Sequence, residues 1–110
     1  MTTDENLIDW AQVASLRDDV GEEDFDEVVG LFIEEVETEL AGLAPDAGHM
    51  QLCNTLHFLK GSALNIGFKE MATLCGQGEA IAKNGVTDGI DIPLIAETFN
   101  ASKAAFEAQI

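Results

Sequence analysis

Apolar residues recur every three to four positions along most of this chain, which is the spacing of one face of an α-helix. The pattern is clearest from Leu52 to Ile66, where 100° per residue places five apolar side chains on one stripe. A second long stripe begins at Phe25 and ends at Leu43, with acidic residues opposite it. The sequence therefore predicts five helices, over about residues 9–18, 24–43, 48–66, 69–84 and 91–109.

The predicted helix ends follow from residues with marked backbone preferences. Gly21 separates the first two helices, and Asp46 is placed to cap the third. Gly67 suits the left-handed conformation that ends a helix, and Asp91 is placed to start the last one. The connections between the four long helices are short, which favours antiparallel neighbours.

These helices predict an all-α domain, namely an antiparallel up-and-down four-helix bundle over residues 1–110. The short first helix, which carries Trp10, Val13 and Leu16, is expected to lie over the bundle as a lid. A chain of 110 residues supports one domain with one modest core. In the last three helices the residues expected to face that core are Leu52, Leu56, Leu59, Ala63, Ile66, Met71, Leu74, Cys75, Ile81, Ile95, Phe99, Ser102, Phe106 and Ile110.

The net charge of −16 is unevenly distributed. Residues 1–47 carry −14, residues 48–84 carry +1, and residues 85–110 carry −3. Such acidity argues against a nucleic-acid-binding protein, which needs a basic face. A nearly neutral patch on a strongly acidic body would steer an approaching partner towards that patch.

Composition narrows the class of protein further. No run of apolar residues reaches the ~18 of a membrane span, and the start of the chain lacks the features of a signal peptide, so a cytoplasmic protein is expected. Cys53 and Cys75 are too far apart in the predicted hairpin to form a disulfide and are interpreted as small buried side chains.

His57 lies on the third predicted helix but off its apolar stripe. Its side chain points well over 90° away from the stripe and therefore towards water. Lys60 follows one turn later, and Gly61, which has no side chain, lies directly above. An imidazole in this setting adds little packing energy. Its position is typical of a nucleophile exposed to an incoming group.

A motif surrounds this histidine and consists of His57, Leu59, Lys60, Gly61, Ser62 and Gly67. The motif resembles the signature of histidine-containing phosphotransfer (Hpt) domains of bacterial phosphorelays, and Asp9-Trp10, Leu74-Cys75 and Glu79 extend the resemblance over most of the chain. The resemblance implies a phosphorelay intermediate that accepts a phosphoryl group on His57, through Nε2, from a receiver-domain aspartate or a histidine kinase. It would then pass the group to another response regulator, and it would act as a monomer.

Imidazole suits such a relay because, with an ordinary pKa of about 6.5, much of it is neutral and nucleophilic at cellular pH. Lys60 is placed to offset the charge of the phosphoryl oxygens. If Gly67 and Phe68 form a tight hairpin, residue 57 lies level with residue 79, so Glu79 is the candidate to accept a hydrogen bond from Nδ1–H. The alternative for Glu79 is an ordinary surface acid.

The partner-docking surface is predicted around the histidine. Gly61 costs about 1 kcal/mol relative to alanine in mid-helix, and leaving room for a partner would explain it. Phe58, Leu64 and Phe68 are expected to be partly exposed and to form the docking surface, although Phe58 could equally pack under the first helix. Gly76 and Gly78 depart from the family pattern, and they either weaken the fourth helix or open space beside His57.

The chain shows no ATP-binding motif, so the sequence predicts a phosphotransfer protein without kinase activity, cofactor or metal site of its own. Magnesium would come from the partner. Two alternatives remain open. His49, Cys53 and His57 have the i, i+4, i+8 spacing of metal ligands, although Lys60 would repel a cation. The bundle could also bind a kinase or regulator without carrying phosphate.

Overall fold

The computed structural model describes residues 7–44 and 46–109, and every long regular element in these ranges is a helix, which confirms the predicted all-α fold. Ile110, assigned to the last apolar stripe, lies outside the described residues. The helices are α2 (Trp10–Val20), α3 (Glu22–Ala41), α4 (His49–Ile66), α5 (Lys69–Lys83) and α6 (Ile92–Gln109).

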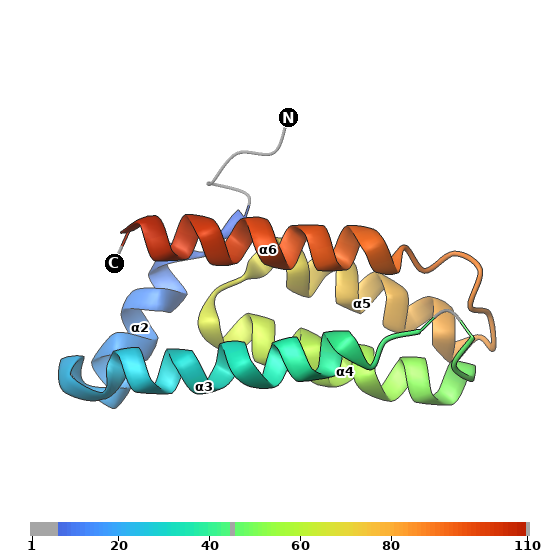
Figure 1. Cartoon of the computed structure of the whole chain (residues 1–110), viewed down its shortest axis with the longest axis horizontal. Helices are drawn as coiled ribbons and strands as arrows, with labels where there is room; N and C mark the ends of the chain where they lie inside the picture. The colour runs from blue at the N-terminus through green and yellow to red at the C-terminus, as the bar shows by residue number, and fades with distance from the viewer. Residues whose placement is uncertain (1–6, 45, 110) are drawn as a thin grey trace.

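The four longer helices run lengthwise and α2 lies across one end of them (Figure 1). Helices α4 and α5 form an antiparallel hairpin and make the most extensive helix–helix contact. The Asp9 N–H donates to the Gly67 carbonyl at 2.7 Å, and the Gln12 side chain donates to the Asn65 carbonyl at 3.1 Å. The first described helix therefore packs on the turn of the hairpin as well as on α3.

The turn between α4 and α5 requires glycine for two reasons. Gly67 has φ of 83°, a left-handed conformation that ends α4 as predicted. A Cβ at this position would also lie 2.8 Å from the Asp9 carbonyl oxygen and 2.9 Å from Cγ2 of Val13. Any other residue would therefore strain the turn and push α2 away from the hairpin.

Several predicted helix ends need correction. Asp46 does not cap α4, which begins after Gly48 without a side-chain cap. Helix α3 begins and ends two residues earlier than predicted. The predicted end was too late because Leu43, which completes the apolar stripe, is buried although it lies beyond the end of the helix. An apolar stripe thus indicates burial, and here burial continues past the last helical turn. Asp91 does accept a hydrogen bond from the Leu94 N–H, as its predicted role at the start of α6 requires.

The predicted core is confirmed along α4. The exposed fraction of each stripe residue from Leu52 to Ile66 is at most 1%. Below α2 the core consists of aromatic rings: Phe106 packs against Trp10, Phe25 and Phe68. Fully burying such a ring contributes roughly 1.5–3 kcal/mol. The buried stripe of α4 thus faces the core, and the opposite face of this helix is left accessible for a functional site.

Phe68 does not belong to the docking surface, contrary to the prediction. The residue is fully buried, and its ring packs against Phe99 and Phe106. The left-handed Gly67 reverses the chain so that the next residue points into the core. Its place in a short connection suggested exposure, but the aromatic side chain closes the end of the bundle instead.

Candidate functional site

His57 projects from the exposed side of α4, with 70% of its side chain accessible to solvent. The neighbouring stripe residues Leu56 and Leu59 are fully buried, so the helix position itself fixes the outward direction of the imidazole.

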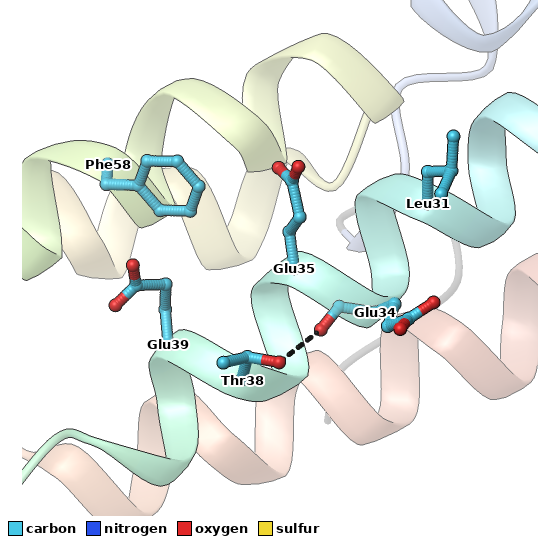
Figure 2. Close-up of a pocket in the computed structure, with 6 residues that line it drawn as sticks. All are labelled: Leu31, Glu34, Glu35, Thr38, Glu39 and Phe58. Carbon is cyan, nitrogen blue, oxygen red and sulfur yellow. Dashed lines mark hydrogen bonds between the residues drawn. The ribbon is translucent and has the colours of Figure 1, made fainter.

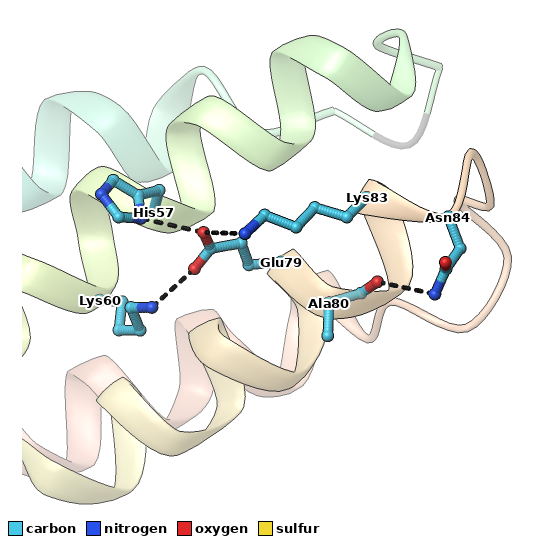
Figure 3. Close-up of polar contacts among 6 residues, drawn as sticks. All are labelled: His57, Lys60, Glu79, Ala80, Lys83 and Asn84. Atoms are coloured by element: carbon cyan, nitrogen blue, oxygen red, sulfur yellow. Dashed lines mark hydrogen bonds and ion pairs between the residues drawn. The ribbon is translucent and has the colours of Figure 1, made fainter.

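The hairpin brings Glu79 of α5 to this imidazole. Nδ1 of His57 lies 2.9 Å from Oε2 of Glu79, as the hairpin register predicted (Figure 3). Only 7% of the Glu79 side chain is exposed. The interpretation of Glu79 as a surface acid is therefore wrong.

Two lysines also contact the Glu79 carboxylate. Nζ of Lys60 lies 2.9 Å from Oε1, and Nζ of Lys83 lies 3.7 Å from Oε2 (Figure 3). The Lys60 contact is an ion pair and not a well-aligned hydrogen bond, since Oε1 is buried without a hydrogen-bond partner of good geometry among the described residues. The carboxylate thus binds three nitrogen groups from two helices.

This environment keeps Glu79 ionised. The Lys60 ammonium is the largest cause, burial acts in the opposite direction, and His57 adds to the effect of Lys60, so that the pKa of the Glu79 carboxyl lies below its usual 4.5. An ionised carboxylate only accepts hydrogen bonds. Nδ1 of His57 must therefore carry the proton, and in the neutral imidazole the free lone pair lies on Nε2.

The surroundings of His57 on α4 are open. A Cβ added at Gly61 would meet no atom within 4 Å, and Phe58 and Leu64 are 39% and 53% exposed. Gly61, Phe58 and Leu64 therefore lie at the surface as predicted, and Phe58 is not packed under α2.

The two glycines of α5 have different surroundings. A Cβ at Gly76 would lie 3.4 Å from Cδ of Lys60, so this glycine leaves room for the lysine stem. A Cβ at Gly78 would lie 3.0 Å from Leu56 and 3.3 Å from Ile90, so this glycine allows close packing of the core. Gly76 serves the site, whereas Gly78 serves the bundle.

The candidate metal ligands do not form a cluster. His49 is exposed and Cys53 is half-buried, and both line a shallow pocket that also includes Lys83. Among the described residues, no group of three or more His, Cys, Asp or Glu side chains is arranged to hold a metal ion. Within the same residues, no helix is both long and apolar enough to cross a membrane.

The family model of the Hpt domain matches residues 27–105, a segment that contains α4, α5 and the whole polar cluster around Glu79. The chain belongs to the Hpt domain family.

A solved structure supports the fold of this Hpt domain. The chain is similar to Ypd1, a histidine phosphotransfer signaling protein of Saccharomyces cerevisiae, which was co-crystallised with the receiver domain of its downstream response regulator Ssk1. The identity is 21%, the TM-score is 0.62, and the match covers 92% of this chain and 88% of Ypd1. No curated protein sequence matches the chain significantly.

An open groove of about 480 Å³ adjoins the site of the Hpt domain (Figure 2). Phe58 of α4 forms one wall, and α3 forms the other with Leu31 and three glutamates. The lining residues are Leu31, Glu34, Glu35, Thr38, Glu39 and Phe58. The exposed apolar side chains of this groove, Leu31 and Phe58, are thus bordered by glutamates.

Lys83 was not among the site residues predicted from the sequence. Its signal was present, because Lys83 follows Glu79 by four residues and such pairs face each other on a helix. That spacing becomes informative only when Glu79 is known to be buried, since an ion pair between a lysine and an exposed acid contributes little to stability.

Proposed function

We propose that His57 is the residue through which this phosphorelay intermediate accepts a phosphoryl group and passes it on. The donor is either a receiver domain, through its aspartyl phosphate, or a histidine kinase. The acceptor is the aspartate of another response regulator. The supporting observation is a single contact: Nδ1–H of an exposed imidazole donates to a buried carboxylate, which leaves Nε2 as the free nucleophile.

The transfer step uses this geometry directly. The Nε2 lone pair attacks phosphorus, the bond between phosphorus and the aspartate oxygen breaks, and the aspartate leaves as a carboxylate. Positive charge develops on the ring as the Nε2–P bond forms. The Glu79 carboxylate stabilises that charge through Nδ1–H, and the reverse transfer follows the same path.

Lys60 has the complementary role. Its ammonium lies one helical turn from His57, and its side chain is 35% exposed, so it can reach the oxygens of a phosphoryl group on Nε2. The group that is transferred carries negative charge on its oxygens throughout the reaction. Lys60 offsets that charge, whereas Glu79 orients the ring.

The partner domain docks over Gly61, Phe58 and Leu64. Bare helix backbone at Gly61 lets a receiver approach the imidazole, and the two apolar side chains provide contact area beside it. The acidic groove next to Phe58 favours a receiver with basic residues on its docking face. Ypd1, which shares the fold, was crystallised with a receiver domain.

The proposed role is that of a carrier. Phosphate enters from an ATP-dependent kinase elsewhere in the relay, and the exchange takes place in the cytoplasm, where such a kinase has its ATP. The partner supplies the magnesium ion and the acid–base groups of the aspartate site.

The test is transfer from a receiver domain labelled with radioactive acetyl phosphate and then repurified. After mixing, we expect label on this chain that is lost in acid and stable in base, as for a phosphoramidate, and no label on His57→Gln. Binding of the receiver without transfer would overturn the proposal in favour of a phosphate-independent interaction module.

A further inference from the structure

The buried Glu79 carboxylate has more counter-charge than the imidazole alone requires. Oε1 pairs with Lys60, while Oε2 is shared by His57 at 2.9 Å and Lys83 at 3.7 Å. Figure 3 shows Lys83 approaching the carboxylate from the side opposite the His57 ring. Lys83 therefore lies on the Nδ1 side of the site, away from the nitrogen that would carry phosphate.

Phosphorylation would place a competing demand on Lys60. A phosphoryl group on Nε2 brings about two negative charges to the site. When the Lys60 ammonium turns to those oxygens, Glu79 loses its nearest cation. A buried carboxylate without a counter-charge is costly and is relieved by taking up a proton. A protonated Glu79 would be neutral, so it would accept the hydrogen bond from Nδ1–H less strongly and orient the ring less firmly.

We propose that Lys83 is a positioning residue of the phosphotransfer reaction, which acts through Glu79 by keeping that carboxylate ionised and in place when Lys60 turns to the phosphoryl group. This inference rests on the proposed function. Lys60 and Lys83 then have separate duties, one at the phosphate and one at the carboxylate.

The placement of Lys83 suits this duty. It lies on the same helix as Glu79, four residues later, so their separation does not depend on movements of α4 or its partner. Its side chain is 67% exposed, which costs little desolvation. The remaining titratable neighbour is Cys75, a buried thiol whose pKa is raised to about 12 by burial and by the charge of Glu79, so it supplies no proton at neutral pH.

The first experiment imitates the departure of Lys60 without any phosphate. The titration midpoint of the Glu79 carboxyl is measured from its ¹³C NMR shift in Lys60→Met and in Lys60→Met with Lys83→Met. We expect the second substitution to raise the midpoint by about one pH unit. Lys83→Arg in the same background should keep the midpoint of Lys60→Met. Adding Lys69→Met, which removes an exposed lysine about 15 Å from Glu79 along the same helix, is the matched control and should leave the midpoint unchanged.

The second experiment examines the protein after phosphoramidate has phosphorylated His57. At pH 7, where the phosphoramidate survives, the ¹³C shift of the Glu79 carboxyl in phosphorylated Lys83→Met should lie closer to that of the protonated acid than it does in the phosphorylated wild type. The ¹⁵N shift of Nδ1 should move with it, whereas a structural role for Lys83 would change neither signal. This single variant also decides the question if the double variant fails to fold.

Equal midpoints with and without Lys83 in the first experiment, or equal carboxyl shifts in the second, would overturn the inference. A wild-type protein that takes no label from phosphoramidate or from a receiver would overturn the proposed function instead. The first experiment then still shows whether Lys83 holds the charge of Glu79, so the two failures are distinguishable.

Discussion

Helix α3 and the α4–α5 hairpin have similar apolar seams but opposite arrangements of charge. Helix α3 carries nine acidic residues and no basic one, and most of them are exposed. The hairpin carries only Glu70 and Glu79, and the second of these is buried under two lysines and a histidine. Exposed charges are weakened by water and salt, so α3 offers a diffuse field. One buried acid, in contrast, fixes the position and protonation of its neighbours.

The comparison predicts that function depends on the few polar residues of the hairpin far more than on the many acids of α3. His57→Gln tests the extreme case. The variant should fold normally, because the ring is exposed, and should lose all phosphate acceptance. Acid-labile phosphate on the chain measures phosphate acceptance, and circular dichroism measures helicity. Residual label at the wild-type level, or a large loss of helicity, would contradict the assignment, and His49→Gln is the control that should retain labelling.

Gly61→Arg separates docking from chemistry. Arginine is a better helix former than glycine, and a Cβ at Gly61 meets no atom, so thermal stability should be kept. Labelling by acetyl phosphate or phosphoramidate should persist, because a small donor passes the side chain, but transfer from a receiver should be lost.

Gly30→Arg is the matched control for this substitution on α3. Gly30 is also a mid-helix glycine in open space, on the face of α3 next to α6. Receiver transfer should proceed in that variant. Wild-type transfer in Gly61→Arg would show that the docking surface lies elsewhere.

Lys60→Ala should slow transfer by about 10²-fold, because the ammonium that offsets the negative charge of the phosphoryl oxygens during transfer is lost. The dissociation constant for the receiver should change much less, because the ammonium acts on the phosphoryl group and not on the docking surface. Single-turnover transfer rates and binding measured separately provide the comparison. An unchanged rate would identify Lys60 as an ordinary surface lysine.

Glu79→Gln keeps an acceptor for Nδ1–H but removes the charge, so transfer should slow about tenfold. The substitution also changes the pH dependence of stability. Because the pKa of folded Glu79 lies below 4.5, its ionised form stabilises the fold above that pH, and the contribution is lost as pH falls through the lowered value.

The wild type should therefore exceed Glu79→Gln in unfolding free energy most clearly at neutral pH, and the difference should shrink as the pH falls below 4.5 and through the lowered pKa of Glu79. Urea unfolding at each pH measures it. Glu34→Gln, which removes an exposed carboxylate from α3, is the matched substitution. A difference for Glu79→Gln that stays constant with pH would contradict the ionised, buried carboxylate.

The smallest effect is expected from Gly30→Ala. The added Cβ meets open space, so α3 should gain up to ~1 kcal/mol and the melting temperature should rise by about 4 °C. Transfer should not change. A calorimetric scan and a transfer assay suffice, and a slower transfer would mean that α3 contributes more to the site than its charge.

Regular helix geometry could be predicted from the sequence, whereas features that depend on tertiary packing could not. The stripes predicted the fold, and the hairpin register predicted the contact between His57 and Glu79, because both depend on regular helix geometry and on a short connection. Phe68 was assigned wrongly, since the direction of a side chain after a left-handed glycine is set by tertiary packing. Lys83 was missed for a related reason, because its importance depends on the burial of another residue.

The contact of Gly67 with α2 has a consequence for the order in which the chain assembles. The hairpin joins residues that are close in sequence, whereas the bond from Asp9 to Gly67 closes a loop of more than fifty residues. Short loops close at lower entropic cost, so we expect the hairpin, and with it the histidine and its carboxylate, to form before the first helix arrives. A nascent or truncated chain would then display a chemically complete site on an unfinished bundle.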